Sequence, residues 1–366
     1  MMRIGVWSAM MALALCAGGS NSLLHAQTLG TTSGPWVMEK SGTTAGLRGI
    51  HAVGGGVAWA SGTNGTVLRT EDGGYEWQSC AMPPGAEKLD FRGIWAWDDN
   101  TAVVMSSGTG EASRIYKTVD GCSSWKLTNT NDDKDGFWDA IVFQNGDYGF
   151  AIGDAHTGEV IGDPLEGRFD TRTMLLGYGW FIDDAGCKAQ RGEAAFAASN
   201  SSVFVFGSRR YILGTGGKPG PHALLSPLLI GKGGSDPCLV VNVPIAGGSD
   251  SSGIFSLSFR DLSHGVAVGG DYTKPNESAE TAAWSADGGK TWTAAARPPH
   301  GYRSAVAWDA DAKAWIAAGT NGSDTSYDDG KTWVSLDDGN WNALSLPWVV
   351  GPNGRIAKLD PGKLPK

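Results

Sequence analysis

The sequence has few charged residues and, among these, few basic ones. Only 18% of the 366 residues are charged, and 29 Lys and Arg stand against 38 Asp and Glu, so the formal net charge is −9. Proteins that bind nucleic acids or anionic membranes through general electrostatics need a basic surface. This composition therefore predicts that the protein has no nucleic-acid partner.

Sequence motifs of several enzyme and cofactor classes are also missing. No serine lies in a G-x-S-x-G elbow, and none of the six histidines has metal-ligand spacing. The glycine-rich run Gly214–Gly217 is not followed by the Lys-Ser/Thr pair of a phosphate-binding loop. We therefore expect no hydrolase triad, no cofactor and no dedicated metal site.

Long hydrophobic runs are absent except near the N-terminus. There Arg3 precedes an apolar stretch, Ile4–Ala17, and a small residue stands before Gln27. This arrangement is typical of an export signal over residues 1–26, and the apolar stretch is too short to span a bilayer comfortably. The sequence thus predicts a periplasmic or secreted protein with no integral membrane span after signal removal.

The alternative for this end of the chain is a lipoprotein anchored through Cys16. That alternative requires a small residue before the cysteine, where the bulky Leu15 stands. Behind the signal, residues 27–34 are expected to be a flexible lead-in. Residues 35–366 are expected to form one domain.

Cysteine is scarce as well, and four cysteines remain once the signal is removed. They are Cys80, Cys122, Cys187 and Cys238. An even number in an exported protein permits two disulfides. The spacing leaves their pairing open.

Glycine and tryptophan are abundant, with 55 and 16 residues, and they recur in a pattern. The motif S/T-x-D-x-G-x-x-W is complete at 70–77, 285–292 and 326–333, whereas at 118–125 Cys122 replaces the glycine of the motif. Asp accepts hydrogen bonds within a turn, Gly permits positive φ, and Trp packs over the loop. This motif is the Asp-box, or BNR repeat, and its expected structural residues are Asp72, Trp77, Asp120, Trp125, Asp287, Trp292, Asp328 and Trp333.

The spacing of the boxes predicts seven repeats of a four-stranded unit. Degenerate boxes around Asp184 and Asp236 fill the long central gap, and the period is that of a propeller blade. The expected first strands are 47–53, 91–97, 137–143, 193–199, 254–259, 302–308 and 341–346. The last unit lacks a fourth strand, so we expect 35–40 to pair beside 354–359 and close the ring. The predicted fold is an all-β, seven-bladed propeller of four-stranded antiparallel blades.

Several segments resemble one known family in addition to the boxes. They are Gly162–Phe169, Gly192–Ser199, Gly269–Tyr272 with Pro275, and Gly301–Ser304. With the boxes they make the chain similar to the photosystem II stability/assembly factor family and its relatives in non-photosynthetic bacteria. The resemblance implies a non-enzymatic binding or assembly scaffold with a protein client. It does not identify the client.

Sialidases share the Asp-boxes and provide the alternative interpretation. Their Phe/Tyr-Arg-Ile-Pro motif is absent, because Gly-Ile follows Phe91-Arg92 and Ser-Ala follows Tyr302-Arg303. A glycoside hydrolase or a carbohydrate-binding module is therefore the second hypothesis. In this hypothesis Asp163 and Asp271 are the candidate carboxylate pair.

Three arginines stand at the heads of expected first strands and define the candidate site. Arg48, Arg92 and Arg303, next to Tyr302, are expected at one mouth of the channel, and Trp138 is expected at the matching place in the third unit. Guanidinium groups there would suit carboxylates of a peptide or a sugar acid. The alternative is that each arginine pairs with an Asp of a neighbouring blade as a structural clamp.

Inserted loops are expected to extend the same site. They contribute Asp163 and Arg168 from the third unit, and Asp271 and Tyr272 from the fifth. The acidic segment 153–172, which includes His156, allows a divalent cation as an alternative. Its spacing matches no known metal motif, so solvated loop charges are preferred.

Overall fold

In the computed structural model the chain is built almost entirely from antiparallel strands. The structure describes residues 34–145, 148–156, 166–175, 179–182, 187–206, 210–226 and 238–365. These residues belong to one compact unit. Within them there are two short 3-10 helices, η1 (Gly110–Ala112) and η2 (Pro361–Lys363), and no helix is long and apolar enough to cross a membrane. The expected signal over 1–26 and most of the lead-in lie outside the described residues.

The first three sheets follow each other directly along the chain. The first contains β2 (Leu47–Gly54), β3 (Val57–Gly62), β4 (Val67–Thr70) and β5 (Gln78–Ser79). The second contains β6 (Phe91–Ala96), β7 (Ala102–Ser106), β8 (Arg114–Thr118) and β9 (Lys126–Thr130). The third contains β10 (Trp138–Asn145), β11 (Tyr148–His156), β12 (Glu166–Leu175), β13 (Gly179–Ile182) and β14 (Lys188–Gln190).

The remaining sheets continue this order. The fourth contains β16 (Val203–Phe206), β17 (Arg210–Gly214), β19 (His222–Leu225) and β20 (Leu239–Asn242). The fifth contains β21 (Ser252–Phe259), β22 (Gly265–Asp271), β23 (Ala282–Ser285) and β24 (Thr293–Ala294), joined by the short β15 (Glu193–Ala194) and β18 (Gly216–Gly217). The sixth contains β25 (Ala305–Asp309), β26 (Ala314–Gly319), β27 (Gly322–Ser326) and β28 (Val334–Asp337). The seventh contains β29 (Ala343–Ser345), β30 (Trp348–Val350), β31 (Ile356–Leu359) and β1 (Trp36–Glu39).

Two expectations about the middle of the chain are wrong. The fourth sheet begins with β16 rather than with 193–199, because Glu193 and Ala194 pair with Gly217 and Gly216 instead. The acidic segment 153–172 is not one long loop, since β11 extends to His156 and β12 begins at Glu166. The degenerate boxes around Asp184 and Asp236 lie outside the described residues.

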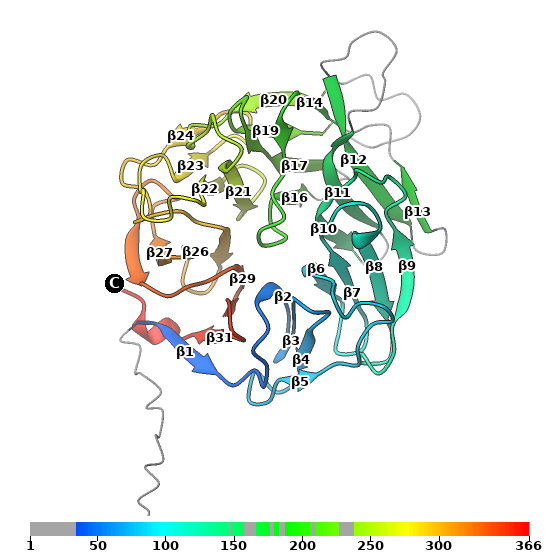
Figure 1. The fold of residues 1–366 in the computed structure, drawn as a ribbon. Helices are drawn as coiled ribbons and strands as arrows, with labels where there is room; N and C mark the ends of the chain where they lie inside the picture. Colours follow the sequence, from blue (N-terminus) through cyan, green and yellow to red (C-terminus); the bar gives the residue numbers. More distant parts are fainter. Residues whose placement is uncertain are drawn as a thin grey trace, which may run out of the picture. The chain divides into compact units, whose positions relative to one another are not determined.

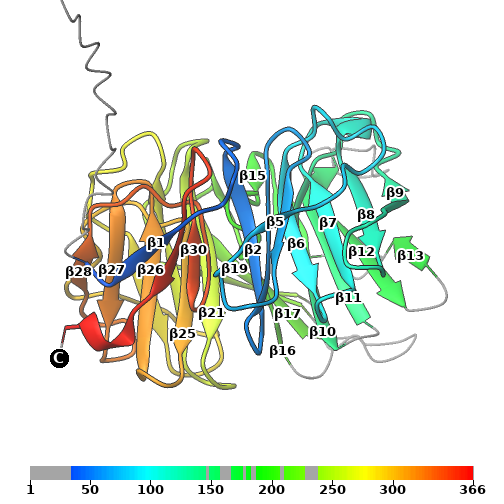
Figure 2. The same cartoon turned by 90° about the horizontal axis from the view of Figure 1, so that it is seen from below.

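The sheets follow one another around a common centre in chain order (Figure 1). Turned by 90°, the strands of neighbouring sheets run side by side along the central axis (Figure 2). Seven buried hydrophobic clusters lie between the sheets. Each cluster joins two successive sheets, and one of them, around Leu47 and Trp348, joins the first sheet to the seventh. The core is therefore distributed between sheet faces rather than gathered at one centre.

The two ends of the described chain meet in the seventh sheet. Strand β1 pairs antiparallel with β31, with Trp36 opposite Leu359 and Glu39 opposite Ile356. The Trp36 side chain is 1% exposed and lies against Trp341, with ring centroids 6.0 Å apart. The outer strand of this sheet thus comes from the beginning of the chain (Figure 1).

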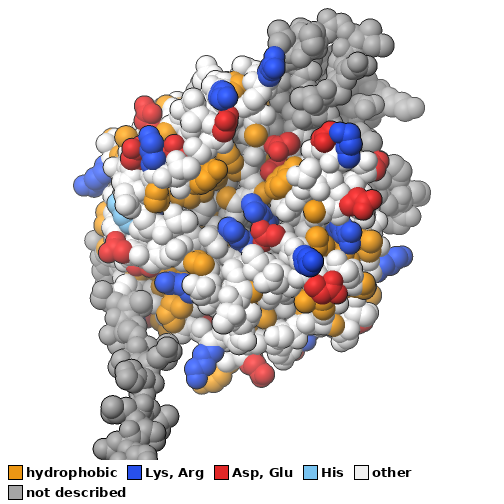
Figure 3. Space-filling model, viewed as in Figure 1, with side chains coloured by type: hydrophobic (Ala, Val, Ile, Leu, Met, Phe, Trp, Pro, Cys, Tyr) orange, Lys and Arg blue, Asp and Glu red, His pale blue; other side chains and the backbone are white. Residues whose placement is uncertain are grey.

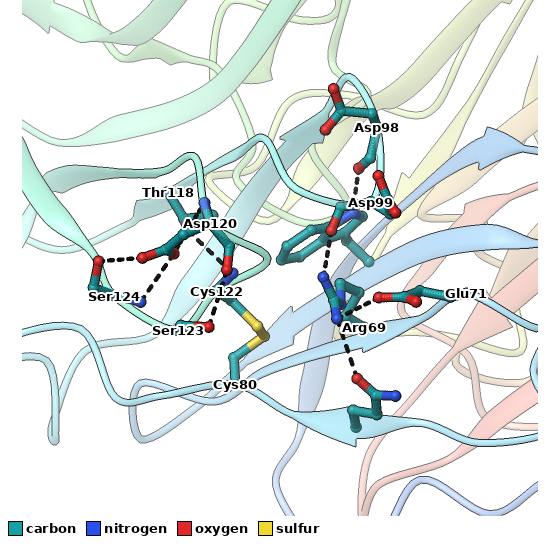
Figure 4. Close-up of a disulfide and its surroundings, with 12 residues drawn as sticks. Arg69, Glu71, Cys80, Asp98, Asp99, Thr118, Asp120, Cys122, Ser123 and Ser124 are labelled. Atoms are coloured by element: carbon teal, nitrogen blue, oxygen red, sulfur yellow. Dashed lines mark hydrogen bonds and ion pairs between the residues drawn. A yellow bond between two sulfur atoms is a disulfide. The ribbon is translucent and has the colours of Figure 1, made fainter.

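The four copies of the S/T-x-D motif form the same turn between the third and fourth strands of their sheets. At 118–125 the Thr118 hydroxyl donates to Asp120 Oδ1 at 2.8 Å and accepts from the Cys122 amide (Figure 4). The Ser124 amide in turn donates to Asp120 Oδ1 at 3.0 Å. Equivalent bonds form around Asp72, Asp287 and Asp328. The motif residues therefore satisfy one another within each turn.

Two disulfides settle the pairing that the spacing left open. Cys80 bonds to Cys122 across the first two sheets, and Cys187 bonds to Cys238. Cys122 has a φ of 62°, at a turn position where the other three motif copies have Gly74, Gly289 and Gly330 with φ between 82° and 92°. A residue with a Cβ is strained in this region, so the cysteine stands there at some conformational cost.

We expect removal of the first disulfide to destabilise the fold in a way that depends on the residue placed at 122. A Cys80→Ala/Cys122→Ala variant should lose about 2–4 kcal/mol, because the bond constrains a long loop of the unfolded chain. A Cys80→Ala/Cys122→Gly variant should lose about 0.5–1 kcal/mol less, because glycine accepts the positive φ. Urea unfolding at equilibrium measures both variants. Equal losses would show that the turn at Cys122 carries no backbone strain.

Candidate functional site

One position at the head of the innermost strands faces the centre of the ring. In the first, second, third and fifth sheets the pairing between the first and second strands has a β-bulge at this position. The extra residues of these bulges are, in the same order, Arg48, Arg92, Asp139 and Phe255. A bulge leaves its extra residue outside the regular alternation and turns its side chain in a new direction. Ser304 and Asn342 hold the matching place in the sixth and seventh sheets, as the hydrogen bonds described below show.

These six residues line one cavity of about 500 Å³, called the central cavity here. Its other lining residues include Asp154, Phe196, Asp250, Tyr272 and Tyr302. Residues from six of the seven sheets therefore meet in one place although they are far apart in sequence. A propeller brings such residues together because the heads of its innermost strands converge at the axis.

The basic part of the cavity consists of Arg48 and Arg92, with Asp90 between them. Arg92 Nε donates to Asp90 Oδ2 at 2.8 Å, and another of its nitrogens donates to the carbonyl of Ala197 at 3.2 Å. Arg48 Nε lies 4.0 Å from the same carboxylate and has no hydrogen-bond partner among the described residues. Arg92 is thus held in place, whereas Arg48 retains hydrogen-bonding capacity.

The acidic part of the cavity consists of Asp139 and Asp154. Burial and the charge of Asp154 raise the pKa of Asp139 well above its ordinary value, against the opposing effect of Arg92. Burial also raises the pKa of Asp154 to about 6, although a hydrogen bond from the Ala195 amide acts in the other direction. Two buried carboxyl groups that interact cannot both ionise easily. The pair therefore holds a proton to a higher pH than ordinary aspartates do.

Aromatic rings form the rest of the wall. Phe196 stacks on Phe255 with ring centroids 3.9 Å apart, and Phe255 meets Tyr302 edge to face at 4.8 Å. Tyr302 is 3% exposed, and burial raises the pKa of its hydroxyl above its ordinary value. Tyr272 is 52% exposed at the same wall. The cavity therefore combines an apolar wall with charged groups, as binding sites usually do.

The predicted placement of Arg303 and Trp138 is wrong by one residue. The amides of Leu47, Arg303 and Trp341 make the same bond, each donating to a glycine carbonyl of the preceding sheet. Arg303 therefore matches Leu47, and it is Ser304 that matches Arg48. Trp138 likewise takes the core position and is fully buried, while Asp139 faces the cavity.

Arg303 lies instead inside the protein, where it pairs with Asp324 of its own sheet. Its side chain is 0% exposed, and its Nε donates to Asp324 Oδ2 at 2.6 Å. Further bonds run to the carbonyl of Tyr302 and to the side chain of Asn321. For this arginine the structural clamp, the alternative interpretation, describes the observed contacts, although its partner belongs to its own sheet.

The other predicted site residues are only partly placed in the cavity. Tyr272 and Tyr302 line it, but Asp271 does not, because its carboxylate accepts bonds from the amide and hydroxyl of Thr273 in the turn after β22. Asp163 lies outside the described residues. The backbone of Arg168 is opposite His156 in the ladder between β11 and β12.

Sequence reasoning missed Asp139, Phe255, Ser304 and Asn342 as lining residues. Each follows directly a buried residue at the strand head: Trp138, Ile254, Arg303 or Trp341. Aligning the repeats on this large buried residue, instead of on the arginines, would have placed all six cavity positions in one column.

The face drawn in Figure 3 has basic and acidic side chains together near its centre, with hydrophobic side chains close by. Within the described part of the chain, no group of three or more His, Cys, Asp or Glu side chains is placed to hold a metal ion. Arginine and aspartate side chains provide the charges that line the cavity.

Comparison with solved structures finds this architecture in proteins of low sequence identity. A structure described as YCF48 bound to D1 peptide matches with a TM-score of 0.56 at 15% identity, over 89% of this chain and 94% of that one. The WD40 repeats of RRP9 match with a TM-score of 0.55 at 11% identity, over 88% of this chain and 99% of that one. The computationally designed protein Ika8 matches with a TM-score of 0.51 at 11% identity, over 89% of this chain and 99% of that one.

At this level of identity the likeness shows the fold alone. Together with the sheets described above, it defines the chain as an all-β propeller with four-stranded antiparallel blades. No protein-family model and no curated protein matches the sequence.

Proposed function

We propose that the protein is an exported, non-enzymatic scaffold that holds a segment of a partner protein in the central cavity. In this proposal the seven sheets are seven blades, and β1 closes the ring by completing the blade that β29 begins. The Asp-box turns serve as structural hairpins of the blades. Export is supported by the apolar N-terminal segment of the sequence and by two disulfides, which are typical of oxidising compartments.

The observation that carries the proposal is the state of Arg48. Its side chain is 36% exposed, its nearest carboxylate is at 4.0 Å, and its Nε has no hydrogen-bond partner among the described residues. A guanidinium group in this state can bind a carboxylate of the partner through two parallel hydrogen bonds. The structure of YCF48 with D1 peptide provides a precedent for peptide binding by a propeller of this kind.

Arg48→Ala should abolish capture of carboxylate-bearing peptides and leave the fold intact. The probe is a pool of random hexapeptides with free C-terminal carboxylates, compared with an amidated pool that lacks Asp and Glu. Wild-type protein should retain the acid pool at least about tenfold better, as expected for a charge-assisted hydrogen bond. The ion pair at 4.0 Å is partly exposed, so its loss should change the melting temperature little.

The matched control is Arg297→Ala, which removes an exposed arginine that does not line the cavity. It should bind the acid pool as the wild type does. Equal capture by the Arg48 variant would contradict the proposal. Arg48-dependent binding of galacturonate or sialic acid in preference to peptides would favour the carbohydrate hypothesis, and turnover of sialosides would show an enzyme.

A further inference from the structure

Two β-bulges aim a pair of carboxyl groups into the central cavity. Asp139 is the extra residue between Trp138 and Ala140, where β10 pairs with β11. Asp154 is the extra residue between Gly153 and Ala155, where β11 pairs with β12. Both side chains line the cavity. The third sheet therefore places two carboxyl groups at one point through two separate irregularities, a device common beside functional sites.

Each of these carboxyl groups has one buried oxygen that receives no hydrogen bond from the described residues. Asp139 is 2% exposed, and its Oδ2 has no hydrogen-bond partner within the described part of the chain. The same holds for Asp154 Oδ1. Arg92, whose charge lowers the pKa of Asp139, already donates to Asp90 and to the carbonyl of Ala197. An unsatisfied buried carboxyl group is costly, so the site calls for a donor that the described residues do not supply.

We propose that Asp139 and Asp154 form a subsite for a primary ammonium group. An ammonium group is a compact charge with three N–H donors, so it can satisfy oxygens of both carboxyl groups at once. This inference rests on the proposed function and deepens it, because the segment held in the cavity would carry an ammonium group as well as the carboxylate that Arg48 binds. The shared chemistry is that of a lysine side chain or a chain N-terminus.

The electrostatics of the pair agree with this assignment. Burial and mutual repulsion raise the pKa of Asp139, and burial raises the pKa of Asp154 to about 6. A bound cation would replace the proton that the pair otherwise retains, since an opposite charge favours the ionised form. The aromatic wall of Phe196, Phe255 and Tyr302 would cover the aliphatic part of the ligand.

The proposal can be tested with small probes on the full-length protein. Butylammonium presents the donors, tetramethylammonium presents the charge without donors, and butanoate presents the opposite charge. Binding is followed through the carboxyl carbon resonances of ¹³C-labelled aspartate. Butylammonium should shift the Asp139 and Asp154 resonances, and Asp139→Asn should weaken its binding about tenfold, as expected for a charged hydrogen bond. Asp311→Asn is the control, because Asp311 is an exposed carboxylate that does not line the cavity.

Equal binding of tetramethylammonium, or unchanged binding of butylammonium by the Asp139 variant, would overturn the proposal. The melting temperature gives a second readout. Because Asp139 Oδ2 has no partner to lose, Asp139→Asn should leave stability unchanged or raise it. A loss of stability would assign Asp139 a structural role instead.

Two amides distinguish the source of the ammonium group. Nα-acetyl-lysine amide offers only a side-chain ammonium, whereas leucine amide offers only an α-ammonium. Nα,Nε-diacetyl-lysine amide, which has neither, should not bind. Failure of the ammonium subsite is separable from failure of the proposed function, because Arg48-dependent capture of the acid peptide pool would persist in the first case and vanish in the second.

Discussion

Arg303→Met should lower the free energy of unfolding by about 3–5 kcal/mol, the usual effect of removing one partner of a buried ion pair. Arg303 is 0% exposed, and Asp324, its partner, is 1% exposed. Without the guanidinium group the Asp324 carboxylate would remain buried beside His300 alone, which contacts it at 2.8 Å. Urea unfolding at 25 °C measures the change. Peptide capture by the fraction that remains folded should be retained, because Arg303 does not line the cavity.

The matched variant is Arg303→Met/Asp324→Asn, in which neither charge is left alone. It should recover a large part of the lost stability, because the cost arises mainly from an unpaired buried charge. If the double variant is no more stable than the single one, the pairing of charges is not what holds this region together.

The same network predicts a dependence of stability on pH. Burial opposes ionisation of Asp324, but the bond from His300 and the charge of Arg303 outweigh it, so the pKa of Asp324 is lowered from 3.8. Its contribution is therefore present above pH 3.8 and lost as the pH falls through the folded-state pKa. The bond to Asp324 raises the pKa of His300 from 6.5, so that contribution is present below pH 6.5 and lost as the pH rises through the raised value. Asp324→Asn should therefore weaken the pH dependence of the free energy of unfolding in both pH ranges. Urea unfolding at a series of pH values measures this change.

Trp36→Ala should cost a similar amount, about 3–5 kcal/mol, because it removes a large buried aromatic side chain. Trp36 packs in the hydrophobic cluster between the sixth and seventh sheets, and its Nε1 donates to Ser323 Oγ at 2.8 Å. It thereby links β1 to β27 of the neighbouring sheet as well as to β31. Urea unfolding at equilibrium, followed by far-UV circular dichroism, gives the measurement.

Val37 provides the control on the same strand. Its side chain points to the other side of β1 and is 47% exposed. Val37→Ala should therefore change stability by less than about 1 kcal/mol, the usual range for surface substitutions. Comparable losses in both variants would indicate that β1 contributes through strand pairing alone, without the packing of Trp36.

The class of fold and the pairing of the two chain ends follow from the sequence alone. The four S/T-x-D motifs and the alternating strands predict repeated antiparallel sheets, because hairpin turns and strand alternation are encoded within a few neighbouring residues. The absence of a fourth strand in the last unit predicts that segment 35–40 pairs beside 354–359, and β1 and β31 are paired in this way. Arg48 and Arg92 were also located as neighbours from the repeat alignment, and both line the cavity.

Which side chains face the centre depends instead on how the strands and sheets pack. Arg303 is buried against Asp324, whereas the next residue, Ser304, lines the cavity. In the same way Trp138 is buried and the next residue, Asp139, lines the cavity. Bulges shift the register by one residue, and a shift of one residue in a strand moves a side chain to the opposite side. The strand pattern does not reveal such a shift, because it depends on contacts with a neighbouring strand and sheet. For the same reason the disulfide pairing, which joins cysteines 42 and 51 residues apart, emerged only from the packed sheets.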